Sequence, residues 1–313
     1  PDSMKIFINL KLITYIITIL FISGCAKNTT PLAPINLDPS LNDIQFGTDE
    51  TFEIITWNIE NFPKQNTTTV QMAKDIILAI DADVYALQEI ESSSYFDLLI
   101  DELNTADTTS AWIGYVTSCG NFCMELSYII KSNTVTIINE PFEIYPYEGS
   151  AFPREPYIFD LLFNSDSIRI INNHLKCCGG GDNESRRQLA SELLQEWVED
   201  NPEYGNVIIV GDWNDEIHEP QSTNVFWNFI ENDQQYLFAD MELAEDPTEN
   251  SWSYPSWPSH IDHILITDDL FDEFENPISK IQTILVGDYL PGAFIEYNQK
   301  VSDHLPVGLK LKF

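Results

Sequence analysis

One segment of the chain reads Val207-Ile208-Ile209-Val210-Gly211-Asp212-Trp213-Asn214, in which four β-branched residues lead into a glycine and then into Asp212 and Asn214. A short run of β-branched residues favours a β-strand, and a run without polar interruption favours a strand buried on both faces. Polar side chains directly after such a strand are exposed by the loop that follows it. The segment therefore predicts a buried strand whose carboxyl end carries an aspartate and an asparagine.

Further β-branched and apolar runs of strand length occur on both sides of this segment. They are residues 52–57, 84–87, 127–130, 157–163, 168–172, 261–266 and 307–311. Between some of them, apolar residues recur with helical spacing from Val70 to Ile80 and from Leu189 to Val198. A hydrophobic fraction of 43% is ample for a buried core, and no Pro/Gly/Ser-rich linker divides the interior. We expect one α/β domain over residues 44–313.

Polar side chains able to bind metal or move protons stand at the ends of several of these predicted strands. Asn58, Glu89 and His174 follow strands, whereas Asp262 and the pair Asp303-His304 stand at strand starts. Because loops at strand ends expose their side chains, this repeated placement favours one reaction site on one rim of the fold. The sequence disfavours nucleoside triphosphate chemistry, since the glycine-rich segment 179–181 lacks the lysine and flanking pattern of a phosphate-binding loop.

Taken in order, these segments resemble the endonuclease/exonuclease/phosphatase superfamily. That superfamily includes deoxyribonuclease-type enzymes, abasic-site endonucleases, bacterial sphingomyelinases and inositol polyphosphate phosphatases. The matching segments are Thr56-Trp57-Asn58-Ile59-Glu60, residues 83–89, residues 152–156, Asn173-His174-Leu175, Gly211-Asp212-Trp213-Asn214, residues 261–264 and Ser302-Asp303-His304-Leu305-Pro306. The resemblance implies a four-layer α/β sandwich, in which two mixed β-sheets pack face to face with helices on the outer faces.

The resemblance also implies a set of site residues. The ligands of Mg²⁺ or Mn²⁺ would be Asn58, Glu89 and Asp303. The catalytic residues would be His174, Asp212, Asn214, Asp262 and His304. Oxygen ligands suit these hard cations. A structural Ca²⁺ is an alternative that the sequence leaves open.

The catalytic residues receive distinct roles from the resemblance. His304 would orient or deprotonate the attacking water, with Asp262 polarising its imidazole. Asp212 and Asn214 would position the water and the phosphate, and His174 would give a proton or hydrogen bond to the developing negative charge.

Arg154 resembles an arginine that contacts substrate phosphate in deoxyribonuclease-type members, and its guanidinium can grip two phosphate oxygens at once. The alternative is a surface ion pair with Glu155 or another acidic residue. We expect the remaining histidines not to be catalytic. His218 and His260 are expected to be solvated, and His263 is expected to pack within a strand.

The amino-terminal residues form a separate segment. Met4-Lys5 precedes a mainly apolar run that ends in Ile22-Ser23-Gly24-Cys25, which resembles a bacterial lipobox. A plain signal peptide or a single membrane anchor is the alternative. We expect a lipoprotein signal peptide over residues 1–25, lipidated at Cys25, and a polar tether over residues 26–43. This places the protein in the bacterial cell envelope, anchored to a membrane by lipid.

Four cysteines remain once Cys25 is assigned to lipid, namely Cys119, Cys123, Cys177 and Cys178. An even number in an oxidising compartment favours disulfides, whose connectivity the sequence leaves open; pairing of the first two cysteines with the last two would link two loops. A zinc site is disfavoured, because the adjacent Cys177 and Cys178 are poorly spaced to ligate one tetrahedral ion.

The chain is strongly acidic, with 15 Lys+Arg against 50 Asp+Glu and a net charge of −35. A nuclease approaches a polyanion and usually has a basic face. One explanation of the acidity is solubility in a salty environment. The other is a substrate that is small or not strongly anionic, or one whose phosphates are bound mainly by metal ions.

From these observations we expect a monomeric extracytoplasmic phosphoester hydrolase, a nuclease or general phosphodiesterase that binds nucleic acid or another phosphodiester. The alternatives are a sphingomyelinase-type lipid phosphodiesterase, a phosphatase of inositol or sugar phosphates, and a non-catalytic surface binding protein.

Overall fold

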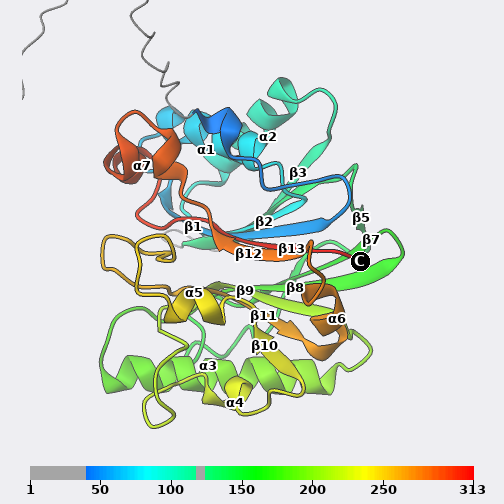
Figure 1. Cartoon of the computed structure of the whole chain (residues 1–313), viewed down its shortest axis with the longest axis vertical. Helices are drawn as coiled ribbons and strands as arrows, with labels where there is room; N and C mark the ends of the chain where they lie inside the picture. Colours follow the sequence, from blue (N-terminus) through cyan, green and yellow to red (C-terminus); the bar gives the residue numbers. More distant parts are fainter. Residues whose placement is uncertain (1–39, 118–123) are drawn as a thin grey trace, which may run out of the picture. The chain divides into compact units, whose positions relative to one another are not determined.

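The computed structural model of the chain describes residues 40–117 and 124–313. Two β-sheets lie against each other in the middle of the fold (Figure 1). The first sheet has the order β12-β13-β1-β2-β4-β3 and the second the order β10-β11-β9-β8-β7-β5, with β6 paired to β7. The strands of the first sheet are β1 (Phe52–Phe62), β2 (Val84–Ile90), β3 (Trp112–Val116), β4 (Glu125–Lys131), β12 (Lys280–Thr283) and β13 (Val307–Leu311). Those of the second are β5 (Thr136–Ile137), β6 (Phe142–Glu143), β7 (Tyr157–Phe163), β8 (Asp166–His174), β9 (Val207–Asp212), β10 (Tyr236–Phe238) and β11 (Asp262–Thr267).

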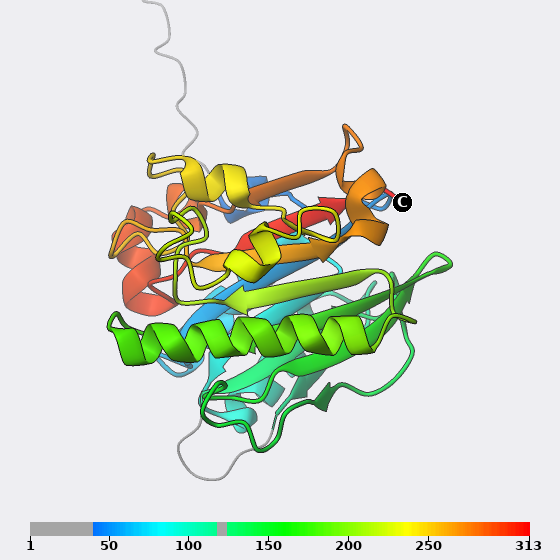
Figure 2. The same cartoon turned by 90° about the horizontal axis from the view of Figure 1, so that it is seen from below.

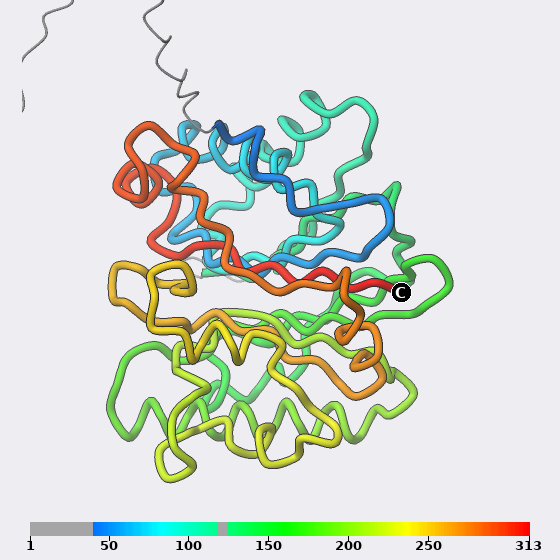
Figure 3. Tube along the Cα trace, in the orientation of Figure 1, coloured from blue at the N-terminus to red at the C-terminus, as the bar shows by residue number. Residues whose placement is uncertain are grey.

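Both sheets are mixed, because each contains a parallel pair among antiparallel neighbours. In the first sheet β1 runs parallel to β2 and antiparallel to β13, which returns the end of the chain to the centre of the fold. Figure 3 shows β13, in red, beside β1, in blue. In the second sheet β8 and β9 are parallel and β11 is antiparallel to β9.

Alternation of side chains along each strand fills two cores at once. In β1, Phe52 and Ile54 enter the core between the sheets, whereas Ile55 and Trp57 enter the core beneath the helices. All four are fully buried, which explains why these strands are apolar on both faces.

Helices cover the outer face of each sheet. The first sheet is covered by α1 (Thr67–Ile80), α2 (Ser93–Ala106) and α7 (Ala293–Lys300), and the second by α3 (Gly181–Asp200) and α4 (Trp227–Ile230). Figure 2 shows α3 lying along the outer face of the second sheet. The remaining short helices are η1 (Leu41–Asp43), α5 (Met241–Glu245), η2 (Asp268–Leu270), α6 (Phe271–Phe274) and η3 (Val286–Tyr289). The expected four-layer sandwich is confirmed.

Two local expectations need correction. Strand β1 extends to Phe62 and β2 to Ile90, so Asn58 and Glu89 lie within their strands and not after them. Helix α3 begins at Gly181 and buries Ala190, Leu194 and Val198, which share one face at a spacing of four residues. Leu189 lies outside that face and is 36% exposed, so it is not part of the buried stripe.

The structure also corrects the expectation of disulfides at Cys177 and Cys178. Cys177 and Cys178 are free, and the Cys178 thiol donates a hydrogen bond to Cys177 Sγ over 2.9 Å, well beyond the length of a disulfide bond. Neither thiol forms the expected disulfide. Cys119 and Cys123 lie outside the described residues, as does Cys25 with its expected signal peptide. Within residues 40–117 and 124–313, no helix has the length and apolar character needed to cross a membrane.

Candidate active site

Strand register in the second sheet brings three polar side chains to one edge. His174 is the last residue of β8, Asp212 is the last of β9, and Asp262 is the first of β11. Asp212 is the register partner of both His174 and Asp262. Because β11 is antiparallel to its neighbour, its first residue lies beside the last residues of the other two strands, so the three residues form a row across the sheet.

The first sheet meets this row through Asn58 on β1 and Glu89 on β2. Asn58 Nδ2 donates to Glu89 Oε1 over 3.1 Å and to Asp212 Oδ2 over 2.9 Å. Asn58 Oδ1 accepts the backbone N–H of Glu60 over 2.9 Å, which fixes the direction of the amide. One buried amide therefore holds a carboxylate from each sheet at a shared edge.

Backbone conformation around the site is unusual, and Gly211 is the clearest case. Gly211 has φ 151°, and a Cβ atom added there would lie 2.0 Å from the backbone oxygen of Asn173. Only glycine fits this close approach between β8 and β9. Glu89 (φ 68°) and Asn214 (φ 57°) also occupy the left-handed region, which is strained for residues with a side chain. Such strain concentrates at functional sites.

His304 and Asp262 form a buried pair. His304 Nδ1 donates to Asp262 Oδ2 over 2.8 Å, and Asp262 is fully buried. The other ring nitrogen, Nε2, lies 3.9 Å from Asp212 Oδ2. The ring of Tyr254 packs on the imidazole with centroids 4.6 Å apart. The pair thus points one free imidazole nitrogen at the row of polar side chains.

Electrostatics of the site differ sharply between its histidines. Burial alone would lower the pKa of His304, but attraction to Asp262, Asp212 and Asp303 raises it to about 10. Burial, reinforced by the positive charge of Arg154, holds the pKa of His174 well below its ordinary value. In the absence of a metal ion, His304 is therefore an imidazolium and His174 a neutral imidazole at neutral pH.

Two aspartates hold their protons unusually tightly. Burial and repulsion from Asp262 raise the pKa of Asp212 to about 7. Burial also raises the pKa of Asp303 to about 6, against the attraction of His304 and with repulsion from Glu60. Carboxylates crowded in this way are stabilised in the ionised form by a nearby cation.

The donor set fits a hard divalent cation. Glu89 and Asp212 supply carboxylate oxygens, and Asn58 Oδ1 keeps a lone pair besides the one used by Glu60. The backbone N–H of Asp303 donates to Glu60 Oε2 over 2.8 Å, and the part of its carboxylate in metal binding stays a prediction. Ligand atoms of Asp212, Asp262 and His304 also lie within 4.8 Å of one another.

His174 and Arg154 also interact with Glu89 and Asp212. His174 Nε2 lies 3.4 Å from Asp212 Oδ2 and 3.9 Å from Glu89 Oε1. Arg154 donates from Nε to the backbone oxygen of Met124 over 3.0 Å. Burial lowers the pKa of Arg154, while the charges of Glu89 and Asp212 act against this. The alternative ion pair between Arg154 and Glu155 is not formed in the described part of the chain.

Two further residues organise the site without having been assigned a role from sequence. Ser302 Oγ donates to the backbone oxygen of Asn58 over 2.7 Å and accepts the N–H of His304 over 2.9 Å. Glu60 accepts the N–H of Asp303. Both lie inside the matching segments: Ser302 directly precedes Asp303, and Glu60 is two residues after Asn58. Their closeness in sequence to predicted site residues could have indicated that they support the site. Asn214 is anchored by donating its N–H to Asp212 Oδ1 over 3.0 Å.

Two mixed sheets packed face to face, with clustered carboxylates and a histidine–aspartate pair at one edge, define a metal-dependent hydrolase of phosphoester bonds. The chain belongs to the endonuclease/exonuclease/phosphatase family, whose model matches residues 55–304.

Several solved structures share this fold at low identity. A humanized D. rerio TDP2 with 14 mutations is 15% identical, with 84% of this chain and 100% of that chain covered and a TM-score of 0.61. The human nocturnin catalytic domain is 17% identical, with 84% and 95% covered and a TM-score of 0.60. An endonuclease/exonuclease/phosphatase family protein from Bacteroides thetaiotaomicron is 15% identical, with 83% and 97% covered and a TM-score of 0.55. No curated protein sequence matches this chain.

Proposed function

We propose that the protein is a Mg²⁺- or Mn²⁺-dependent phosphodiesterase that hydrolyses nucleic acid. The observation that carries the proposal is the His304–Asp262 pair, whose contact of 2.8 Å leaves Nε2 of His304 facing Asp212. A buried imidazole with one nitrogen held by a carboxylate and the other free is the arrangement of a general base.

Each site residue has a task in such a reaction. His304 Nε2 takes a proton from the attacking water, and Asp262 stabilises the imidazolium that forms. Asp212 and Asn214 hold the water in line with the phosphorus. Neutral His174 donates a hydrogen bond to the negative charge that develops on the phosphoryl oxygens.

A divalent cation bound by Glu89 and the neighbouring oxygen ligands supplies Lewis-acid charge neutralisation at the phosphoryl group. The chain itself prepares this site, since Asn58 holds Glu89 and Asp212 together. A cation held there would reduce the negative charge acting on His304 and would lower its pKa from about 10, towards the range in which the ring accepts a proton.

A nucleic acid substrate is supported by a comparison and by Arg154. One structure with this fold, at 16% identity and a TM-score of 0.55, is a D. rerio TDP2 complexed with single-strand DNA product. The guanidinium of Arg154 interacts electrostatically with Glu89 and Asp212, and a guanidinium can bind a phosphate through two parallel hydrogen bonds.

The test is to incubate the purified protein with Mg²⁺ or Mn²⁺ and, in parallel, with plasmid DNA, RNA, sphingomyelin, bis(p-nitrophenyl) phosphate and p-nitrophenyl phosphate. The proposal expects cleavage of a nucleic acid and of the generic diester. Hydrolysis of the monoester alone would refute it in favour of a phosphatase. His304→Ala should abolish activity, and His218→Ala, which changes an exposed histidine in a polar loop, should not.

A lipid phosphodiesterase is the second candidate, and one exposed side chain favours it. Trp257 is 75% exposed in a short turn closed by the pairing of Tyr254 with Ser259. An exposed tryptophan can insert into a bilayer interface or stack on a nucleic acid base. Trp257→Ala should reduce cleavage of single-stranded DNA if the first proposal holds. A loss confined to sphingomyelin in vesicles would support the second candidate instead.

We also propose that lipid on Cys25 holds the protein at a bacterial cell envelope. The support is the segment Ile22-Ser23-Gly24-Cys25 at the end of an apolar run. Expression in a bacterial host with labelled palmitate should label the wild-type protein and leave Cys25→Ser unlabelled. Equal labelling of the two proteins would contradict the proposal.

A further inference from the structure

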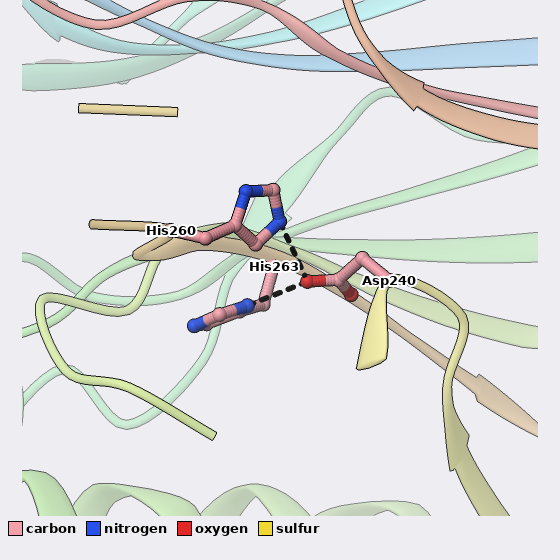
Figure 4. Close-up of side chains that lie close together, drawn as sticks. All are labelled: Asp240, His260 and His263. Carbon is pink, nitrogen blue, oxygen red and sulfur yellow. Dashed lines mark hydrogen bonds and ion pairs between the residues drawn. The ribbon is translucent and has the colours of Figure 1, made fainter. Parts of the chain in front are cut away.

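A second cluster of histidine and aspartate lies outside the proposed reaction centre. Asp240 stands before α5, His260 precedes β11, and His263 lies within β11. Asp240 Oδ2 lies 3.0 Å from His260 Nε2 and 2.6 Å from His263 Nδ1 (Figure 4). The exposed fractions are 0% for Asp240, 3% for His260 and 0% for His263. The expectation that His260 is solvated is therefore wrong, because Asp240 binds it inside the fold.

The outer nitrogens of both rings are committed to backbone carbonyl groups. His260 Nδ1 lies 2.6 Å from the oxygen of Ser251, and His263 Nε2 lies 2.9 Å from the oxygen of Asp215. A carbonyl oxygen only accepts hydrogen bonds, so each of these nitrogens carries a proton. A neutral imidazole has one N–H group, and in each ring this group donates its hydrogen bond to the backbone carbonyl.

The two inner nitrogens, His260 Nε2 and His263 Nδ1, face Asp240 Oδ2. A positive charge is required there, either as protons on the rings or as a bound cation. In two neutral rings, both inner nitrogens would aim lone pairs at a carboxylate oxygen, which is repulsive. Asp240 Oδ2 faces both inner nitrogens, 3.0 Å from His260 and 2.6 Å from His263, and a carboxylate oxygen offers them no proton. The backbone N–H of Ile264 donates to Oδ1 over 2.9 Å and so turns Oδ2 toward the two rings.

Either two extra protons or one divalent cation supplies the missing charge. Two imidazolium rings and one carboxylate sum to a charge of +1, and so do two neutral rings, one carboxylate and one divalent ion. Two imidazolium rings around a single buried oxygen repel each other at full burial. A divalent ion instead uses both lone pairs and the carboxylate as ligands.

We propose that Asp240, His260 and His263 bind a divalent transition-metal ion of the zinc type as a structural site. The three ligand atoms lie within 4.8 Å of one another, and imidazole nitrogen with carboxylate oxygen is a donor set that suits zinc. Metal-ligating histidines commonly donate their outer N–H to a backbone carbonyl, as both do here. Ligands of a tetrahedral zinc lie about 3.3 Å apart, so the contacts of 3.0 Å and 2.6 Å would open by about 0.3 Å and about 0.7 Å.

The proposed site is separate from the reaction centre. Asp262 and His263 are consecutive in β11, so their side chains point to opposite faces of the second sheet. Asp262 faces His304, whereas the ring of His263 packs against Trp213 and Phe238 beneath the outer helices. The ion would link the segments that contain Ser251 and Asp215 to β11, since the two ligand histidines contact the backbone oxygens of those residues. Asp215 directly follows Asn214 in the chain.

The test measures zinc retention by the full chain. The protein is loaded with Zn²⁺, desalted and analysed by mass spectrometry of its metals, and its Tm is compared before and after chelation. We expect one retained zinc ion per chain and a lower Tm after its removal. His260→Asn and His263→Asn should lose the ion. His304→Ala, in the reaction centre, and His218→Asn, on the surface, should retain it.

Two results would overturn the proposal. Wild-type protein without zinc after desalting, and with an unchanged Tm, would show that protons hold the cluster. Zinc lost from His304→Ala but retained by His263→Asn would place the ion in the reaction centre. If the buried variants fail to fold, Co²⁺ is bound to the wild type and to His304→Ala instead. Tetrahedral coordination by nitrogen and oxygen gives a visible absorption band. The proposal requires this band in both proteins.

Discussion

Asn58 Nδ2 donates to Asp212 Oδ2 over 2.9 Å, and this hydrogen bond joins the two sheets of the sandwich at the candidate active site. The same nitrogen donates to Glu89 over 3.1 Å, so one side chain sets the separation of two carboxylates that come from different sheets. Removal of the amide leaves both carboxylates to repel each other.

The first prediction concerns this amide. Asn58→Ala should lower kcat by about 100-fold or more, because the water-positioning and metal-binding carboxylates lose their shared donor. It should also destabilise the fold by about 1–3 kcal/mol, since Asp212 is buried and loses a hydrogen bond. Steady-state kinetics and urea unfolding measure the two effects. A variant with normal kcat and lower stability would limit Asn58 to a structural role.

The second prediction concerns the partner of His304. Asp262→Asn keeps an oxygen that can accept from Nδ1 and removes the charge, so the pKa of His304 should fall from about 10. We expect kcat to fall by about 100- to 10,000-fold, because the imidazolium formed in the reaction loses its counter-charge. An NMR titration of the His304 ring checks the pKa. An unchanged rate would remove Asp262 from the proposed mechanism.

The third prediction concerns stability and pH in metal-free protein. Asp303, Asp212 and His304 all have a pKa raised in the folded state, to about 6, 7 and 10. A raised pKa stabilises the fold below the unfolded value and loses that contribution as pH rises through the folded value. Tm should therefore fall between pH 4 and pH 7 from the two aspartates, and again between pH 6.5 and pH 10 from His304.

Added Mg²⁺ provides the control for this pH dependence. The ion competes with protons for the carboxylates, so its stabilising effect should be larger at pH 8 than at pH 5. Thermal unfolding at both values, with and without Mg²⁺, makes the comparison. Equal stabilisation at the two values would argue against a metal site built on these carboxylates.

The fourth prediction uses two glycines. An alanine at Gly211 would bring its Cβ 2.0 Å from the Asn173 oxygen at φ 151°, whereas a Cβ at Gly149 would meet nothing within 4 Å. Gly211→Ala should lose about 1–3 kcal/mol from backbone strain alone, and more from the clash. Gly149→Ala should be neutral or slightly stabilising. Chemical denaturation compares them, and equal stability would mean that β8 and β9 can separate without cost.

Sequence patterns predicted the central strands well and the edges poorly. β1, β2, β8 and β9 are apolar on both faces because helices cover the sheets, and such runs are easy to recognise. Short edge strands such as β5 and β12 are half exposed and carry little pattern. Helix α2 was not predicted either.

Contacts between residues far apart in the chain determine two features of the structure that the sequence did not predict. The motifs named Asp212 and Asp262, but the register that aligns them with His174 depends on three strands distant in the chain. His260 stands among serines and prolines typical of an exposed turn, and it is buried only because Asp240, 20 residues earlier, binds its ring. Neither relationship is encoded by local spacing.

The last prediction follows from the net charge of −35. Nucleases with a basic face lose affinity for DNA as salt rises, because bound cations are released from the polyanion. In this protein the long-range interaction with DNA is repulsive, and salt screens it over about 10 Å at 0.1 M. With Mg²⁺ held constant, kcat/KM on a DNA oligonucleotide should therefore stay level or rise between 20 and 150 mM KCl. Bis(p-nitrophenyl) phosphate is the control, since its single charge makes it much less sensitive. A steep fall of kcat/KM on DNA alone would reveal a local basic path to the site, and would weaken the inference that the metal ion and Arg154 together meet the substrate phosphates.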